Sequence, residues 1–374
     1  AALDAYTNPG LTSQSAAITS SEESQNNFMQ LAMVKSVVSK SGVSDSKKVN
    51  SSSNKKGIGS AVAESSSSTT SGISENPLRK KESAGEKLEM SACKDADSVY
   101  DKSLGICVRT EGEVLSFVVN VVAGNVMEIE ISSTAATVNW GDGSIDTVSG
   151  NKKHVVHKYT KAGYYNVQVT DLVTKVRIVS GQELIVKLVN IYLPKVKDYS
   201  GLFKDAENMA GSLHNLRFPP KLVNGESMFD NCKKLRGTVP ELPKTLVNGK
   251  RMFYGCEGIF GNVPVLPDTM VNGEYMFYGC LFSENIPPLP SSLTNGEGMF
   301  MNCRGLYKFD FEKFPDRLVN GRNMFAQCSW LSGKIPELPK SLVDGNHMFA
   351  GCGNLKNGVS ALPNSLVDGE AMFS

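Results

Sequence analysis

The sequence predicts a mainly β protein with short helical turns, made of a disordered N-terminal stalk, a small β-sandwich and a solenoid of about seven coils. Three observations support this prediction. Residues 1–88 are polar and rich in serine, and residues 115–178 alternate as half-buried strands do. From Cys232 to Cys352, similar segments recur at a step of 23 to 25 residues. Self-similarity with a period of about 20 to 50 residues is typical of solenoids, whose coils bury their apolar faces against one another.

Length and charge limit the possible functions. A chain of 374 residues has room for more than one domain, and a formal charge of +1 gives no overall attraction to nucleic acid. No apolar run is long enough to predict a membrane-spanning helix. The chain begins at Ala1 without a visible export signal and ends within a repeat, so we expect a processed or truncated product. An assembly partner is expected to cover the uncapped C-terminal end if the natural protein does not continue.

The serine-rich stalk spans residues 1–88. Its apolar residues are too sparse to offset the entropy of ordering, so we expect it to be disordered or extended. One stretch, residues 27–38, has the spacing of a short amphipathic helix. A transient helix within a tether is favoured over the stub of a docking helix, because isolated helices of this length are marginal.

A small segment, residues 89–112, contains Cys93 and Cys107. In an exported protein these two cysteines are expected to form a local disulfide, whereas in a reducing compartment they would be free thiols. A zinc site is disfavoured because two cysteines without a neighbouring histidine do not complete a structural ligand set.

Residues 113–180 carry alternating apolar runs followed by three short motifs. The motifs are W-G-D-G at 140–143, H-x-Y at 157–159 and G-x-Y-x-V-x-V at 163–169. In this order they resemble the PKD-type β-sandwich, a small immunoglobulin-like module. The resemblance implies that His157 and Tyr159 brace the turn that bears Asp142.

The same module contains residue types that bind metal ions. His154, His157, Asp142 and Asp146 are candidate ligands. The two aspartates lack the dense, alternating oxygen ligands of a calcium loop, so we expect no metal here.

Residues 181–227 are expected to form a transition that contains a degenerate first repeat from about Leu202 and caps the array. The array proper, residues 228–374, has the consensus MF-x-x-C-x-x-L-x-G-x-(I/V)-P-x-LP-x-x-LVNG-x-x. The recurring Asn-Gly or Asp-Gly step predicts turns with positive φ. The residue before each first proline (Val239, Val263, Ile286 and Ile335) is expected to point inward from a short strand. The apolar spacing from LVNG to the cysteine and leucine predicts a helical turn on the other side of the coil.

The MF-x-x-C-x-x-L step preceded by LVNG resembles the BspA-like leucine-rich repeat of bacterial surface proteins, a family in which a PKD-like module often precedes the array. The Gly-x-(I/V)-Pro step is also similar to the plant-type leucine-rich repeat, which leaves open the segment that forms the strand ladder. The fourth unit departs from the consensus over residues 307–315 and lacks the first proline. The resemblance implies cell-surface adhesins and host-interaction proteins of bacteria and of some parasitic protists.

One cysteine per coil forms a predicted structural ladder: Cys232, Cys256, Cys280, Cys303, Cys328 and Cys352. In-register stacking would point their Cβ atoms the same way, which opposes disulfides, and one cysteine per coil does not cluster for zinc. Buried free thiols acting as small apolar groups are therefore favoured. The Met-Phe pair of each coil is interpreted in the same way, as core.

The sequence favours binding over catalysis. No catalytic motif, cofactor loop or metal-binding set is present, so we expect no enzyme activity and no cofactor. The leading hypothesis is a cell-surface or secreted, adhesin-like protein that presents its solenoid to a protein or glycan macromolecule of a host or matrix. The alternative is a structural or assembly subunit of a surface appendage or envelope complex.

Candidate partner-binding residues are those that vary directly after each Asn-Gly or Asp-Gly. They are Lys250, Arg251, Glu274, Tyr275, Arg322, Asn323, Asn346 and His347. Because these positions differ between coils while the framework is constant, they are suited to recognition. The simpler interpretation, an ordinary solvated face, is favoured.

Overall fold

The computed structural model describes residues 93–356, 358–359 and 361–374, all within one compact unit. The serine-rich stalk and the helix expected at residues 27–38 lie outside the described residues. The mainly β character is confirmed: the described part has thirteen strands and one short 3₁₀ helix, η1 (Gln182–Leu184). None of its helices has the length and apolar character needed to cross a membrane.

The first element is a hairpin of β1 (Ser98–Asp101) and β2 (Ile106–Arg109). A disulfide joins Cys93 to Cys107 across its base, with the two Cα atoms 5.7 Å apart. The Asp101 carboxylate forms an ion pair with Lys187, which fastens the hairpin to the edge of the main sheet.

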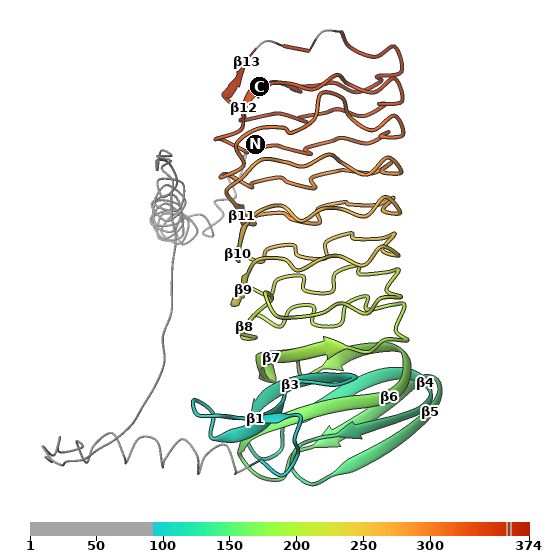
Figure 1. Cartoon of the computed structure of the whole chain (residues 1–374), viewed down its shortest axis with the longest axis vertical. Coiled ribbons are helices and arrows are strands. Elements are labelled where there is room, and N and C mark those ends of the chain that lie inside the picture. Colours follow the sequence, from blue (N-terminus) through green and yellow to red (C-terminus); the bar gives the residue numbers. More distant parts are fainter. Residues whose placement is uncertain (1–92, 357, 360) are drawn as a thin grey trace, which may run out of the picture. The chain divides into compact units, whose positions relative to one another are not determined.

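The main sheet has five antiparallel strands in the order β5-β4-β6-β3-β7. Their bounds are β3 (Val114–Val121), β4 (Val126–Asn139), β5 (Ile145–Lys158), β6 (Gly163–Ser180) and β7 (Ile185–Tyr192). The strands expected for a two-sheet sandwich are thus hydrogen-bonded into one continuous sheet. Strand β4 shifts register against both neighbours between Ile131 and Ala136. Such irregularities bend strands and increase twist, so the long strands curve around their own core, as Figure 1 shows.

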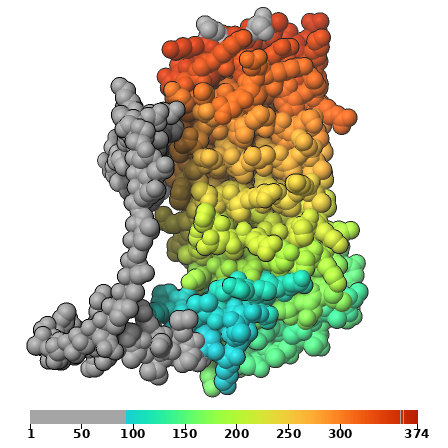
Figure 2. Space-filling view, viewed as in Figure 1, coloured from blue at the N-terminus to red at the C-terminus, as the bar shows by residue number. Residues whose placement is uncertain are grey.

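The sheet continues directly into the repeat array. Strand β7 is the sheet's edge, and its Leu188 N–H donates to the Ala210 carbonyl at 2.8 Å, beginning a parallel stack. On the inside, the ring of Phe117 from β3 packs edge-on against Phe203, at 5.6 Å between centroids. The buried residues of the sheet and of the array form a single apolar core. Figure 2 shows the coils following one another in sequence order from green to red.

Two parallel ladders connect the coils. One consists of β8 (Gly211–Ser212), β9 (Leu235–Gly237), β10 (Gly258–Gly261) and β11 (Leu281–Phe282), followed after the fourth unit by β12 (Ser332–Lys334) and β13 (Asn354–Lys356). The strand ladder therefore lies at the C-x-x-L-x-G step, just before the (I/V)-Pro step where the short strand was expected. The second ladder is a row of single bridges between the Asn or Asp residues of successive Asn-Gly and Asp-Gly steps.

The helical turn expected around the Met-Phe pair is not an α-helix. Within a coil, Met228 N–H donates to Gly225 and Cys232 N–H to Phe229, each 3.1 Å and three residues back. The N–H of Phe229, which lies between these two donors in the sequence, instead donates to the Met252 carbonyl of the next coil at 2.9 Å. An α-helix would keep all these donors within the segment, whereas the neighbouring coil here supplies half of the acceptors. The segment is a series of turns that is hydrogen-bonded to the neighbouring coil.

Positive φ was expected at the Asn-Gly step, and this prediction is wrong, because neither Asn248 nor Gly249 has a positive φ. Positive φ occurs two residues later, for example at Arg251 (52°). Gly249 is required for space instead, because a Cβ there would lie 2.7 Å from Sδ of Met276 in the next coil. The preceding residue, Asn248, turns the chain by accepting a hydrogen bond from the Lys250 N–H at 3.1 Å and donates to Asn224 Oδ1 at 3.0 Å.

Candidate binding surfaces of the repeat array

The candidate metal ligands of the sheet module are divided between two places. His157 Nε2 lies 2.9 Å from Asp142 Oδ2, and its ring stacks on Trp140 at 4.8 Å between centroids. Trp140 Nε1 donates to Asp146 Oδ2 at 2.7 Å. His154 instead contacts Glu128, 2.6 Å away. Among the described residues no group of three or more His, Cys, Asp or Glu side chains is placed to hold a metal ion.

The cysteine ladder lies inside the array. All six thiols are free and buried, and each donates to the backbone carbonyl of a phenylalanine in the preceding coil. Cys256 Sγ, for example, lies 3.0 Å from the Phe229 oxygen. Burial raises the pKa of the Cys256 thiol, which keeps it protonated and able to donate. Beside the ladder the phenylalanine rings stack, with 5.7 Å between the centroids of Phe253 and Phe277.

The eight candidate partner-binding residues are partly or fully buried, and most of them contact residues of adjacent coils. Lys250 Nζ lies 2.9 Å from Glu274 Oε1, and the hydrogen bond to Glu274 raises the pKa of Lys250. Arg251 forms two hydrogen bonds to the fully buried Asp230 carboxylate, at 2.8 and 3.1 Å. The hydrogen bond to Asp230 in turn raises the pKa of Arg251. These cations are thus neutralised within the array.

Beside these ion pairs lies an aromatic group, the tyrosine cluster, defined as Arg251, Tyr254, Tyr275 and Tyr278. The rings of Tyr254 and Tyr278 stack at 4.5 Å, and Tyr275 lies 6.3 and 6.4 Å from them. The Arg251 guanidinium sits 3.8 Å from the Tyr254 ring centroid, in a cation–π contact. All four side chains are partly exposed.

Tyr275 lies against the following coil. Gly298 occupies the position that faces it, and a Cβ there would come within 2.2 Å of the Tyr275 ring. The Tyr275 hydroxyl donates to Glu297 Oε1 at 3.3 Å. Burial, followed by the charge of Glu297, raises the pKa of Tyr275. The ring is therefore held in one place, flat against a glycine that leaves it room.

The remaining four candidates lie in a polar network, which Asn323 connects to Tyr275 by a hydrogen bond. Arg322 donates to Asp344 at 2.9 Å and to Asp368 at 2.8 Å. Asn346 donates to Asp368 at 3.1 Å, and His347 contacts Asn346. Asn323 is partly buried beside Arg322. The structure thus divides the predicted face into an aromatic half and a charge-paired half.

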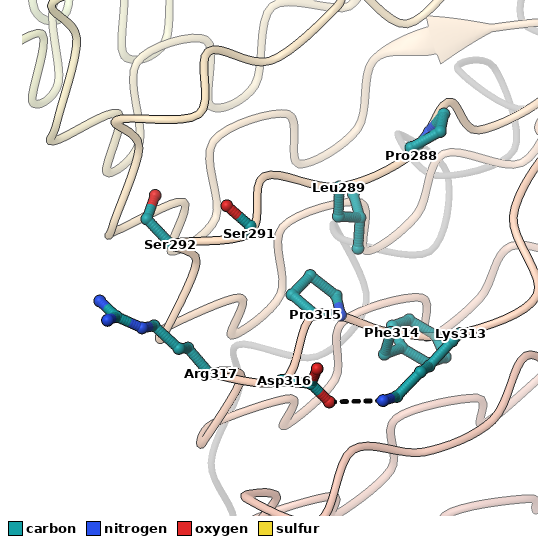
Figure 3. Close-up of a pocket in the computed structure, with 9 residues that line it drawn as sticks. All are labelled: Pro288, Leu289, Ser291, Ser292, Lys313, Phe314, Pro315, Asp316 and Arg317. Carbon is teal, nitrogen blue, oxygen red and sulfur yellow. Dashed lines mark ion pairs between the residues drawn. The ribbon is translucent and has the colours of Figure 1, made fainter.

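A hollow of about 520 Å³ lies between the third and fourth units (Figure 3). Lys313 and Asp316 at its rim pair with each other at 2.6 Å, while Arg317 points away from them. Other coils carry at the position of Arg317 a hydroxyl that donates to the preceding coil (Thr245, Thr269, Ser292, Ser341 and Ser365). Arg317 interrupts this ladder. The polar groups of the hollow do not converge on one point.

Sequence reasoning missed several exposed aromatic residues. Tyr254 and Tyr278 occupy the position after Met-Phe, which is Asp, Tyr, Tyr, Met, Ala and Ala in successive units. That variation was a usable signal. Tyr307 and Trp330, 55% and 40% exposed, lie on the outer side of the strand ladder.

Residues 225–356 match the family model for the BspA type leucine rich repeat region, in six copies. No curated protein and no solved structure matches the chain. The resemblance of the array to BspA-like repeats is confirmed, and repeats of this class typically act as non-enzymatic scaffolds for protein interaction. The match does not include the sheet module, whose likeness to PKD-type domains stays a prediction.

Proposed function

We propose that the protein is a non-enzymatic, surface-exposed or secreted binding protein whose array recognises a protein of a host or matrix. The tyrosine cluster is the observation that carries this proposal. Tyrosine and arginine are enriched among the residues that contribute most to protein–protein binding energy. They provide large contact areas with few rotatable bonds, and each tyrosine adds a hydroxyl for hydrogen bonding.

The electrostatics of the cluster favour a protein over a nucleic acid. Arg251 is compensated by Asp230 and Lys250 by Glu274, so the surface presents little net positive charge to phosphate groups. The cluster is also preorganised, because Tyr254 and Tyr278 stack on each other and Tyr275 rests on Gly298. Preorganised side chains lose less conformational entropy on binding.

The test uses the full chain against a panel of immobilised extracellular-matrix proteins, with affinities measured by biolayer interferometry. Tyr254→Ala and Tyr278→Ala place alanine where Ala326 and Ala350 already stand in later coils, so the framework accommodates the change. Each variant should weaken binding by roughly 30-fold, the effect of losing about 2 kcal/mol at a principal contact. Tyr164→Ala is the control, since Tyr164 is an exposed tyrosine (39%) on the sheet module.

Two outcomes count against the proposal. Equal affinities for the cluster variants and the control would remove the tyrosine cluster as the recognition surface. Recovery of the protein only within a stable complex of envelope or appendage proteins, with no affinity for matrix proteins, would favour a structural subunit instead.

A further inference from the structure

We propose that a second surface, the lysine–aromatic hollow, binds a carboxylated sugar residue of a glycan. This hollow of about 340 Å³ is lined by Tyr307, Trp330, Ser332, Asn354 and Lys356. It lies on the outer side of β12 and β13. None of its residues belongs to the tyrosine cluster, so the proposal stands or falls separately from protein recognition there.

The aromatic walls of the hollow are the first argument. The Tyr307 and Trp330 side chains are 55% and 40% exposed, whereas the stacked phenylalanines of the array, such as Phe300 and Phe325, are fully buried. Within the described residues, neither exposed ring packs against another ring. A pyranose carries C–H groups on its ring faces and hydroxyls around its rim. It therefore matches an aromatic wall bordered by polar atoms.

Unpaired positive charge is the second argument. Lys334 and Lys356 are register partners in the parallel pair of β12 and β13. Like charges placed opposite each other destabilise a sheet. Several other cations of the array are matched across coils, as Lys250 is by Glu274 and Arg322 by Asp344. Among the described residues neither Lys334 nor Lys356 forms an ion pair, so this edge of the ladder has two ammonium groups available for an anionic ligand.

The polar atoms favour a sugar over a phosphate ligand. Asn354 Nδ2 donates one of its two N–H groups to the Ser329 carbonyl at 2.7 Å, so its second N–H remains as a donor and its Oδ1 as an acceptor. The Ser332 hydroxyl donates to the Tyr307 carbonyl at 3.1 Å, which leaves its lone pairs as acceptors. These acceptors need hydroxyl donors, which a sugar supplies and a phosphate group at neutral pH does not. A carboxylated sugar combines those hydroxyls with one negative charge for the lysines.

The test is calorimetric titration of the full chain with two sources of such a sugar. Sialyllactose supplies a sialic acid and is compared with neutral lactose. A hyaluronan tetrasaccharide supplies glucuronate and is compared with its carboxyl-reduced form. We expect at least one acidic ligand to bind about tenfold or more tightly than its neutral partner, the effect of one charge-assisted hydrogen bond. The arm that binds identifies the source of the carboxylate.

Variants then locate the site. Lys356→Ala and Trp330→Ala should each weaken binding of the acidic sugar about tenfold, while Lys340→Ala, an exposed lysine outside the hollow, should leave it unchanged. Thermal melting confirms that the variants fold, which is expected because both side chains are exposed. Equal binding of acidic and neutral sugars, no binding of either acid, or tighter binding of adenosine monophosphate than of either sugar would each overturn the proposal.

Discussion

Replacing Arg251 with alanine tests whether the charge pairs beneath the candidate face are structural. The Asp230 side chain has no exposed surface, and Arg251 binds both of its oxygens, with Nε–Oδ2 at 2.8 Å and Nη2–Oδ1 at 3.1 Å. Arg251→Ala therefore leaves a buried carboxylate without its counter-ion. Breaking a buried ion pair costs about 3–5 kcal/mol. Ser227 still donates to Asp230 at 3.2 Å, and Arg251 is one-third exposed, so we expect the lower end, about 3 kcal/mol.

The assay is urea unfolding followed by tryptophan fluorescence, with a double variant as the control. Asp230→Ala combined with Arg251→Ala removes both charges and places alanine where Ala326 and Ala350 occur in later coils. Because no charge is then buried alone, the double variant should recover most of the free energy of unfolding lost in Arg251→Ala. The slopes with urea should agree among the variants, since the surface exposed on unfolding is nearly unchanged.

Two results would refute this reasoning. A loss below about 0.5 kcal/mol for Arg251→Ala would place the pair among ordinary surface contacts. A double variant as unstable as the single one would mean that Arg251 stabilises the array by packing on Tyr254, from which its guanidinium is 3.8 Å away, and not by compensating Asp230.

Three further predictions concern the framework. Gly258→Ala should destabilise the protein by about 2 kcal/mol in urea unfolding, because its Cβ would lie 2.3 Å from a backbone oxygen of the preceding coil; Gly353→Ala, with nothing within 4 Å, should stay within about 0.5 kcal/mol of the native protein. Burial alone raises the pKa of Asp198, but hydrogen bonds from Lys175 and the backbone outweigh it and lower that pKa. These hydrogen bonds to the Asp198 carboxylate stabilise the fold above the unfolded pKa of about 4, and this stabilisation is lost as pH falls through the lower folded pKa. Asp198→Asn should therefore have a lower melting temperature than the native protein at pH 7, and the difference should shrink in acid. Under native conditions an alkylating reagent followed by mass spectrometry should modify Cys352 first among the six ladder thiols, since Cys352 is 6% exposed whereas the other five have no exposed surface; equal protection of all six would contradict this.

The periodic sequence predicted the array well because the residues that are constant between coils face inward. Met252, Phe253 and Cys256 have no exposed surface, and such positions tolerate little variation when each coil stacks on the next. What the repeat could not show was where each backbone donor finds its acceptor. Apolar residues three or four apart fit a helical turn and a series of turns hydrogen-bonded to the next coil equally well. The neighbouring coil decides between them, by accepting the Phe229 N–H at the Met252 carbonyl.

The Asn-Gly step shows the same limit at the level of one residue. Local turn chemistry assigned positive φ to its glycine, whereas Gly249 is required by contact with Met276 in the next coil. The interacting residues are 27 positions apart. A repeated glycine and a repeated methionine are visible in the sequence, but their contact depends on the offset between coils, which only the stacked structure fixes.

The candidate face stays a prediction, because variability alone does not separate recognition from stacking. Tyr275 and Tyr278 both vary between coils and meet in space, since they lie three residues apart on the same edge of a coil. Arg322 also varies, yet it pairs with Asp344 and Asp368 of later coils, and its variability reflects a locally matched network. The sequence did not reveal these partners because they are 22 and 46 residues away.

Whether a variable side chain finds a partner in a neighbouring coil therefore separates residues that stabilise the stack from candidates for recognition. A variable polar side chain whose charge is matched by a neighbouring coil, as Lys250 is by Glu274, contributes mainly to stacking, and reversing its charge should affect stability before binding. A variable side chain that stays exposed and unmatched is the one whose role stacking does not explain. Trp330 and Lys356 meet this condition, whereas Arg251 meets it only through its contact with an exposed tyrosine. Recognition should accordingly concentrate at the few positions where the repeat leaves aromatic faces and charges without partners of its own.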